Sequence, residues 1–242
     1  MKIGLIQTRG IGDIIIALPI ARHLVDQGHT VVWPVHAPFV APFRAAAPYV
    51  EFLALAGAEG EWMFPKPLEA LKESGCDRIV PLASYIHGAP QLVARPDLAR
   101  IMKFDQYKYA VAGVPFGEKW NLQIDRDRER EEALFRRVVQ EKEFVVCHLQ
   151  GSHFRAGLDV HSMAGGRQVI EISDLTDNFF DWLAVIERAA LRIMIDSCFA
   201  NLTDQLKIAG KKIFLVRSPW EFTPVLLGDW SYLTQSEPGT PG

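Results

Sequence analysis

The fold of this chain is decided at its start, by KIGLIQ (residues 2–7), TRGIGD (residues 8–13) and IIIALPIARHLV (residues 14–25). The first segment is short, apolar and followed by a turn that contains glycine, which is typical of a buried parallel strand. The third segment has an apolar stripe at helical spacing, so we expect a helix over 14–25. Ligands bind outside the carboxyl ends of strands in open α/β sheets. The turn therefore places Asp13 at a candidate binding edge.

Two interpretations of Asp13 are open at this point. Aspartate is a favoured residue at a helix N-cap, and the expected helix begins here. A carboxylate at a ligand-binding edge can also act as a general base. The pattern Gly10-Ile11-Gly12 begins like a dinucleotide fingerprint, but Ile15 stands where the third glycine is required. The glycines still allow close backbone approach, and the helix amides behind them can receive an anion.

Composition limits the class of protein. The chain has 242 residues, 49% of them hydrophobic, and a net charge of -3, so it is globular and gives no electrostatic reason to expect nucleic acid or an anionic membrane as a partner. Cys76, Cys147 and Cys198 are widely spaced, as in a reduced cytoplasmic protein. The apolar run 11–20 is too short to span a bilayer and is interrupted by Asp13. We therefore expect a cytoplasmic protein without a transmembrane segment.

Strands and helices alternate along the chain, which predicts an α/β fold with two Rossmann-like parallel sheets. We expect strands over 2–7, 30–35, 50–55, 77–82, 143–150, 168–172, 191–195 and 212–216. We expect helices over 14–25, 38–47, 67–74, 98–112, 178–190 and 197–209. A stretch of mixed charge at 125–137 indicates a solvated linker and helix face. The predicted organisation is a first domain over 1–117, a linker over 118–142, a second domain over 143–235 and a tail over 236–242.

Polar residues follow two strands of the second half. Asp196 and Ser197 open a helix, where they can cap it or hold a diphosphate together with its first amides. Cys198 in that first turn could have a lowered thiol pKa, but no paired base is visible, so we interpret it as a packing residue. Arg155 is the one strong cation of its loop, either a surface residue or a contact to a phosphate. The nearby histidines lack metal-ligand spacing, so we expect no metal site and no cofactor.

The ordered set of motifs resembles the ADP-heptose:lipopolysaccharide heptosyltransferase family. Gly10-Ile11-Gly12-Asp13 followed by Pro19 is similar to the N-terminal Gly-Asp motif of that family. The segment HLQGS (148–152) resembles its His-Pro-Gly-Ala-Ser turn, and IDSCFANL (195–202) resembles its Asp-Ser/Thr-Gly-x-x-His-Leu segment. The stretches 104–115, 169–172 and 179–190 also resemble its elements. The likeness covers most of the chain in the right order.

This resemblance implies a GT-B fold, in which two Rossmann-like domains face a cleft, and an inverting glycosyltransferase that needs no metal. Asp13 would deprotonate the acceptor hydroxyl, with Arg9, Gly10 and Gly12 on the acceptor side. The diphosphate of a nucleotide sugar would be lined by Gly151, Ser152, Arg155, Asp196, Ser197 and Cys198. The acceptor would be a glycan or another hydroxyl compound. Inversion requires one base at the acceptor and positive dipoles at the leaving group.

The sequence also departs from the family pattern. Cys198 replaces a glycine, Asn201 replaces a histidine, and only residues 152–167 fill the place of a βα unit that carries the donor-site lysine of the family. Arg155 is the substitute that we predict for that lysine. Two alternatives follow from these departures. One is a non-catalytic GT-B-like protein that binds a nucleotide, a glycan or a partner subunit, and the other is a nucleotide-sugar epimerase or hydrolase that acts on the donor alone.

Overall fold

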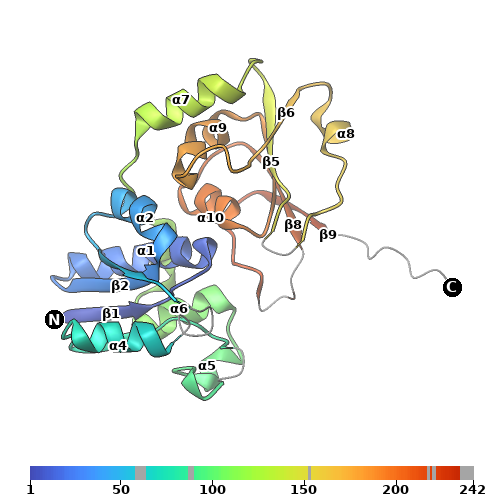
Figure 1. Cartoon of the computed structure of the whole chain (residues 1–242). Coiled ribbons are helices and arrows are strands. Elements are labelled where there is room, and N and C mark those ends of the chain that lie inside the picture. The colour runs from blue at the N-terminus through green and yellow to red at the C-terminus, as the bar shows by residue number, and fades with distance from the viewer. Residues whose placement is uncertain (58–63, 87–89, 152–153, 217–218, 220–221, 235–242) are drawn as a thin grey trace. The chain divides into compact units, whose positions relative to one another are not determined.

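The computed structural model in Figure 1 describes residues 1–57, 64–86, 90–151, 154–216, 219 and 222–234. The chain forms two compact units, Met1–Arg126 and Asp127–Gly242. The boundary between them lies within the segment 118–142, which the charge pattern marks as a linker. Among the described helices, none has the length and apolar character needed to cross a membrane.

The first unit contains the decisive N-terminal stretch and four parallel strands. Its strands are β1 (Lys2–Ile6), β2 (Thr30–His36), β3 (Glu51–Leu55) and β4 (Arg78–Pro81). Its α-helices are α1 (Ile11–Asp26), α2 (Val40–Ala46), α4 (Pro65–Glu73), α5 (Pro96–Ala99) and α6 (Phe104–Ala112). Its 3-10 helices are η1 (Ala37–Phe39), η2 (Pro90–Leu92) and η3 (Phe116–Trp120).

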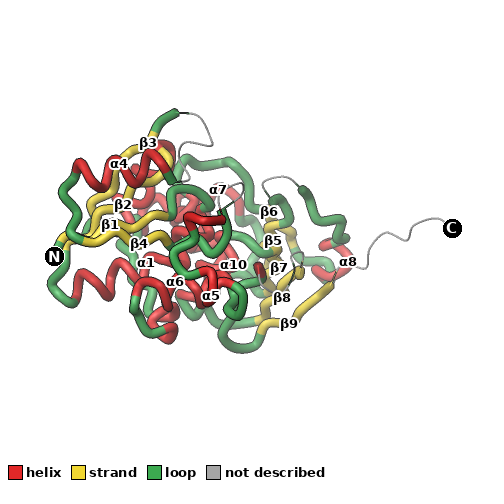
Figure 2. The backbone as a smooth tube through the Cα atoms, turned by 90° about the horizontal axis from the view of Figure 1, so that it is seen from below, coloured by secondary structure: helices red, strands yellow, loops and turns green. Residues whose placement is uncertain are grey.

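The strand order of the first unit is β3-β2-β1-β4, and each neighbouring pair is parallel. Figure 2 shows these strands side by side. Helix α4 packs so closely on β1 that a Cβ atom at Gly4 would lie 2.7 Å from the side chain of Leu71. From β1 the chain passes to β2 on one side and later to β4 on the other. This reversal is a topological switch point, where α/β sheets bind ligands.

The helix predicted over 98–112 is wrong as a single element. The structure has α5 and α6 in its place, with a break between Arg100 and Lys103. Below the break, a buried ion pair fixes the start of α6, because Asp105 Oδ2 accepts a hydrogen bond from Lys119 Nζ of η3 at 2.7 Å. Both side chains are fully buried. Gly113 ends α6 in the left-handed conformation.

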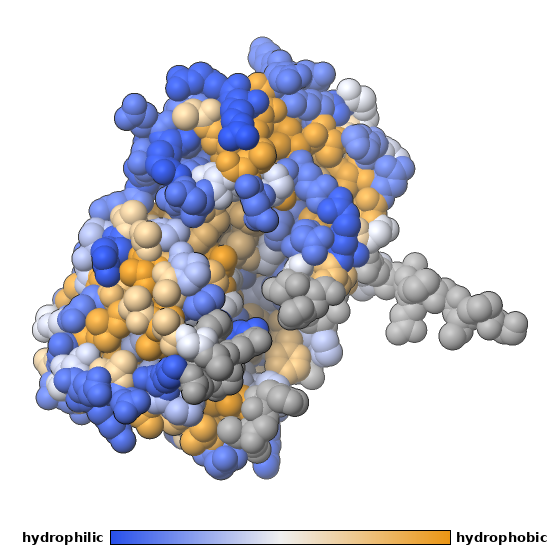
Figure 3. Space-filling model, viewed as in Figure 1, coloured by the Kyte–Doolittle hydropathy of each residue, from blue (hydrophilic) through white to orange (hydrophobic). Residues whose placement is uncertain are grey.

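The second unit has five parallel strands and begins with the charged helix of the predicted linker. Its strands are β5 (Phe144–His148), β6 (Gln168–Glu171), β7 (Leu191–Ile195), β8 (Lys211–Val216) and β9 (Trp230–Thr234). Its helices are α7 (Arg128–Val138), α8 (Val160–Ala164), η4 (Phe179–Trp182), α9 (Leu183–Arg188) and α10 (Cys198–Gln205). The surface over α7 is mostly hydrophilic (Figure 3), as its charge run predicts.

The strand order of the second unit is β6-β5-β7-β8-β9, so its switch point lies between β5 and β7. Strand β9 was not predicted from the sequence. The carboxylate of Asp204 connects α10 to the start of β9. Its Oδ1 accepts hydrogen bonds from Leu227 N, just before the strand, at 2.8 Å and from the indole Nε1 of Trp230 at 2.9 Å. The predicted tail 236–242 lies outside the described residues.

Candidate functional site at the two switch points

Asp13 lies in the first turn of α1, at the switch point of the first unit. The helix begins at Ile11 with Gly10 as its N-cap, three residues earlier than the sequence predicts. Ile14 N donates to Gly10 O at 3.0 Å, so the first turn is closed by the backbone. The interpretation of Asp13 as the N-cap residue is therefore wrong. Asp13 is instead an acidic residue within the first helical turn, near the positive end of the helix dipole.

A buried lysine holds the Asp13 carboxylate. Lys108 Nζ of α6 forms an ion pair with Asp13 Oδ1 at 2.9 Å and donates a hydrogen bond to Gln7 Oε1 at 2.6 Å. Its side chain is only 3% exposed, whereas that of Asp13 is 37% exposed. The same ammonium lies 5.6 Å from the centre of the Phe104 ring, within range of a cation–π contact. One oxygen of a solvent-accessible carboxylate is thus fixed from the protein interior.

Gln7 connects this ion pair to the turn. Its side-chain Nε2 donates to Arg9 O at 2.9 Å, and its backbone oxygen accepts from the indole Nε1 of Trp33 at 3.0 Å. His36 N donates to Thr8 O at 2.8 Å, which anchors the next residue to the end of β2. The turn that precedes Asp13 is therefore held by β2 on one side and by Gln7 on the other.

The three residues predicted for the acceptor side lie in the same turn. Arg9 is half-buried and supplies its carbonyl oxygen to Gln7, Gly10 is exposed, and Gly12 lies in the first turn of α1. Gly10 has φ 77° and ψ 90°, a conformation that other residues rarely adopt. The neighbouring carboxylate also requires glycine at position 10, because a Cβ atom there would lie 2.6 Å from Asp13 Oδ2.

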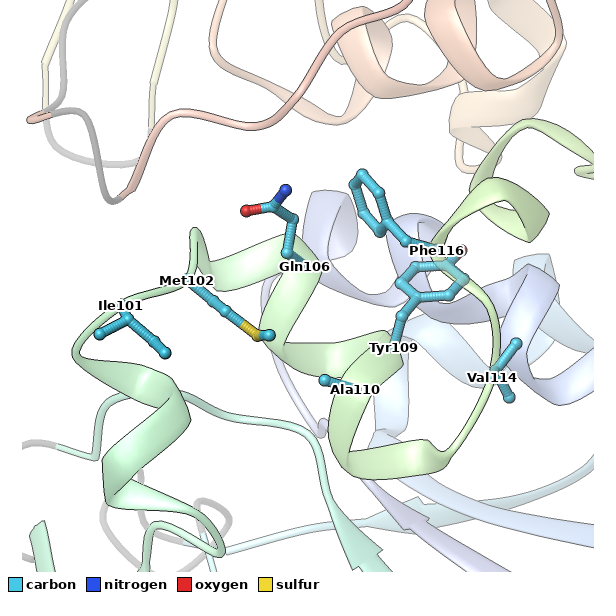
Figure 4. Close-up of a pocket in the computed structure, with 7 residues that line it drawn as sticks. All are labelled: Ile101, Met102, Gln106, Tyr109, Ala110, Val114 and Phe116. Atoms are coloured by element: carbon cyan, nitrogen blue, oxygen red, sulfur yellow. The ribbon is translucent and has the colours of Figure 1, made fainter.

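Helix α6 also borders a pocket of about 410 Å³ in the first unit (Figure 4). Its lining is mainly apolar and consists of Ile101, Met102, Gln106, Tyr109, Ala110, Val114 and Phe116. The rings of Tyr109 and Phe116 meet edge to face at 5.4 Å. The hydroxyl of Tyr109 points away into the core and donates to Ile16 O at 2.8 Å. Asp13 and Lys108 are not among the described lining residues.

In the second unit, Gly151 follows β5 and is adjacent to an isolated antiparallel bridge between Gln150 and Arg155. Gly151 N donates to Phe154 O at 2.7 Å, and Ala156 N donates to Leu149 O at 2.9 Å. A Cβ atom at Gly151 would lie 2.8 Å from the Phe154 ring, which explains the need for glycine. Ser152, predicted to contact the donor, lies outside the described residues.

The structure places Arg155 in an exposed ion pair. Its Nη1 lies 2.5 Å from Glu171 Oε1, and its Nη2 donates to Glu171 Oε2 at 2.7 Å. Glu171 ends β6, which neighbours β5. The bidentate geometry raises the pKa of Arg155, and its charge is matched by that of Glu171. A donor phosphate at this position would therefore meet a neutralised pair.

Asp196 and Ser197 lie between β7 and α10, as predicted. Ser197 is the N-cap of α10, where its Oγ accepts from Ala200 N at 3.4 Å. Burial raises the pKa of the Cys198 thiol to about 12, so the expectation of a lowered pKa is wrong and the packing role remains. Because β5 and β7 are adjacent and parallel, Gly151 and Ser197 follow their strands at the same edge of the sheet.

Two site residues were missed by sequence reasoning, Lys108 and Gln7. A signal existed for the lysine, because it stands between Tyr107 and Tyr109 on a helix that packs against α1. Among the described residues, no group of three histidine, cysteine, aspartate or glutamate side chains is placed to hold a metal ion. The absence of a metal from the reaction stays a prediction.

Comparison with known proteins identifies solved structures that share this fold. No protein-family model and no curated protein matches the sequence. A glycosyl transferase family 9 structure from Veillonella parvula matches with a TM-score of 0.67 and 13% identity, over 99% of this chain and 88% of that one. The Escherichia coli heptosyltransferase WaaC with ADP-2-deoxy-2-fluoro heptose matches with a TM-score of 0.52 and 14% identity, over 96% and 93%. The chain has a GT-B-like α/β fold.

A third neighbour is TibC, an iron-containing dodecameric glycosyltransferase from enterotoxigenic E. coli, with a TM-score of 0.54 and 12% identity. The match covers 88% of this chain and 57% of that one. The resemblance noted in the sequence motifs is thus confirmed at the level of the fold, across sequences that share few identical residues.

Proposed function

We propose that this chain is an inverting glycosyltransferase that moves a sugar from a nucleotide-diphosphate sugar to an acceptor hydroxyl. The observation that carries the proposal is the Asp13 carboxylate, which is partly exposed, lies at the switch point of a GT-B-like sheet and is fixed by Lys108. A base for hydroxyl deprotonation must combine access to the substrate with a defined orientation. Asp13 has both properties.

The proposed reaction proceeds by a single displacement. Asp13 accepts the proton of the acceptor hydroxyl while the acceptor oxygen bonds to the anomeric carbon from the face opposite the leaving group. The bond between that carbon and the diphosphate oxygen breaks, and its electron pair leaves with the nucleoside diphosphate. The N-terminal amides of α10 and the loop at Gly151 would stabilise the developing negative charge on the diphosphate.

The ligands of the structural neighbours guide the choice of donor. WaaC has been solved with ADP and with ADP-2-deoxy-2-fluoro heptose, and TibC with ADP-D-beta-D-heptose. We therefore propose an adenine nucleotide sugar as the first donor to test. We also propose that the transfer needs no metal, and the iron reported for TibC makes this worth a direct test. Activity that survives a chelator supports the proposal, and loss that is restored by one divalent ion contradicts it.

The function is tested first by ligand binding. A thermal-shift panel of nucleoside diphosphates and nucleotide sugars should identify a ligand that raises the melting temperature, because binding to the native state stabilises it by mass action. The bound donor is then incubated with hydroxyl acceptors, and release of nucleoside diphosphate is followed. If no donor is consumed with any glycan, lipid-linked or small-molecule acceptor, the proposed activity is wrong.

The role of Asp13 is tested with Asp13→Asn. Loss of a general base lowers kcat by about 10²- to 10⁴-fold, while donor binding and the melting temperature should remain close to the wild type. The matched control is Asp26→Asn at the other end of the same helix, where the exposed carboxylate pairs with Arg22. Full turnover by Asp13→Asn would refute the assignment of the base.

One observation favours a second candidate function, a protein that binds a nucleotide or glycan without transfer. Arg155, the residue predicted to replace the donor-site lysine, is neutralised by Glu171. Such a protein would show a thermal shift with nucleotides but no release of nucleoside diphosphate in the presence of any acceptor. A donor-only epimerase or hydrolase is distinguished from both, because it would consume the nucleotide sugar without an acceptor.

A further inference from the structure

We infer that Lys108 and Gln7 are positioning residues for the Asp13 base, an inference that rests on the proposed transferase function. The pair Asp13–Lys108 joins residues 95 positions apart in the sequence, so α6 must be docked on the N-terminal turn before the carboxylate is oriented. Lys108 forms its ion pair with the Oδ1 oxygen of the Asp13 carboxylate. Among the described residues, none hydrogen-bonds Oδ2, and this oxygen is the one that the geometry leaves to receive a proton.

The surroundings of Lys108 explain how its buried ammonium group stays stabilised when Asp13 loses its negative charge by accepting a proton. When Asp13 accepts a proton, an ammonium that relied on this carboxylate alone would be left uncompensated in the interior, which is costly. Lys108 has two further contacts, the Gln7 amide oxygen at 2.6 Å and the face of the Phe104 ring at 5.6 Å. Neither contact depends on the protonation state of Asp13. The amide and the ring therefore support the ammonium throughout the cycle.

The Gln7 side-chain amide is oriented so that its oxygen accepts the hydrogen bond from Lys108. Its Nε2 donates to Arg9 O, which leaves Oε1 pointing at Lys108 as the acceptor. The Trp33 indole fixes the Gln7 backbone oxygen at the end of β1. The chain of contacts from Arg9 O through Gln7 and Lys108 to Asp13 Oδ1 aligns the carboxylate on a rigid strand end and a rigid helix. Catalysis is sensitive to such alignment at the scale of 1 Å.

The test compares Lys108→Met, Lys108→Arg and Gln7→Leu in the full chain, with a donor and acceptor that the wild type turns over. Methionine keeps the length and removes the charge, and a neutral apolar residue is well accepted at a buried position. We expect Lys108→Met to lower kcat by about 10- to 100-fold while the KM for the donor and the melting temperature are unchanged. Arginine should restore part of kcat, and Gln7→Leu should lower kcat to a smaller extent.

If Lys108 had a structural role alone, its substitution would lower the melting temperature without changing the ratio of kcat to the KM for the donor. The control Lys72→Met removes a lysine charge from the exposed face of α4 and should leave every parameter unchanged. In the Asp13→Asn background, Lys108→Met should have no further effect on the residual rate, because the two residues act as a unit. Wild-type kcat in Lys108→Met would overturn the inference while the transferase function stands. A wild type without turnover would overturn the function itself and this inference with it.

Discussion

Gly10 and Asp13 share a space that has no room for a side chain between them. A Cβ atom at Gly10 would lie 2.6 Å from Asp13 Oδ2, and Gly10 has a backbone φ of 77°. Gly10→Ala should therefore displace the carboxylate as well as strain the turn. We expect a loss of about 1–2 kcal/mol in the free energy of unfolding from the left-handed conformation. We also expect a fall in kcat of about 10²-fold from misplacement of the base.

The matched control for this variant is Gly28→Ala. Gly28 has φ 82°, but a Cβ atom there would meet nothing within 4 Å. Its φ is positive like that of Gly10 and the collision is absent, so Gly28→Ala should lose stability without loss of kcat. Denaturant unfolding and steady-state kinetics of both variants separate the two effects. Equal kcat in the two variants would contradict the role of Gly10 in positioning Asp13.

The buried pair Asp105–Lys119 should dominate the stability of the first unit. Both side chains are fully buried, and Nζ lies 2.7 Å from Oδ2. Lys119→Met leaves the buried Asp105 carboxylate without its cationic partner, so the free energy of unfolding should fall by about 3–5 kcal/mol. The double variant Asp105→Leu/Lys119→Met should recover much of this loss, because no charge is then left unpaired. A double variant that is less stable than Lys119→Met would contradict this account.

The Arg155–Glu171 pair should control the affinity for anions at the edge of the second unit. Glu171→Gln removes the charge that neutralises Arg155, so the dissociation constant for a nucleoside diphosphate should fall. Arg155→Gln should raise it. Because the pair is exposed, neither change should alter the melting temperature much. Isothermal titration calorimetry at two salt concentrations measures both effects. Identical affinities in the two variants would remove Arg155 from the predicted donor site.

The stability of the protein should fall at alkaline pH. Burial raises the pKa of Cys147 from 9.0 to about 12, so the folded state keeps the neutral thiol while the unfolded chain ionises. The stabilisation is complete below pH 9 and is lost as the pH rises toward 12. Urea unfolding at pH 8, 9 and 10 should show this decline, and Cys147→Ala should reduce its slope. A free energy of unfolding that is constant from pH 8 to 10 would refute the prediction.

Much of the fold was predictable because its parallel strands are short apolar runs that alternate with helical segments along the chain. The strand over 191–195 has the predicted bounds, and the two predicted parallel sheets are confirmed. The break near Lys103 was not predictable, because the helical pattern of 98–112 is continuous and the break depends on the buried partner Lys119. Strand β9 was missed because its sequence mixes polar and apolar residues, and its place in the sheet depends on pairing with β8 and on the contact of Trp230 with the distant Asp204.

The candidate site was predictable in part. Asp13 and Ser197 follow strands, and the rule that ligands bind at the carboxyl ends of strands identifies such positions from sequence alone. The start of α1 was placed too late because Asp13 is a more favoured N-cap residue than glycine, whereas the N-cap of the structure is Gly10. Lys108 and Gln7 could not be paired with Asp13, because that contact depends on the docking of a helix distant in sequence.

The carboxylate of Asp204 has a further consequence for the dynamics of the second unit. It lies near the end of α10 and accepts hydrogen bonds from both Leu227 N and the Trp230 indole. Helix α10 and the start of β9 therefore cannot open independently without breaking these bonds in a buried setting. In native-state hydrogen exchange, the amides of α10 and β9 should exchange with one common opening free energy. The helix that begins at the candidate phosphate site and the last strand of the sheet would then form a single cooperative folding unit.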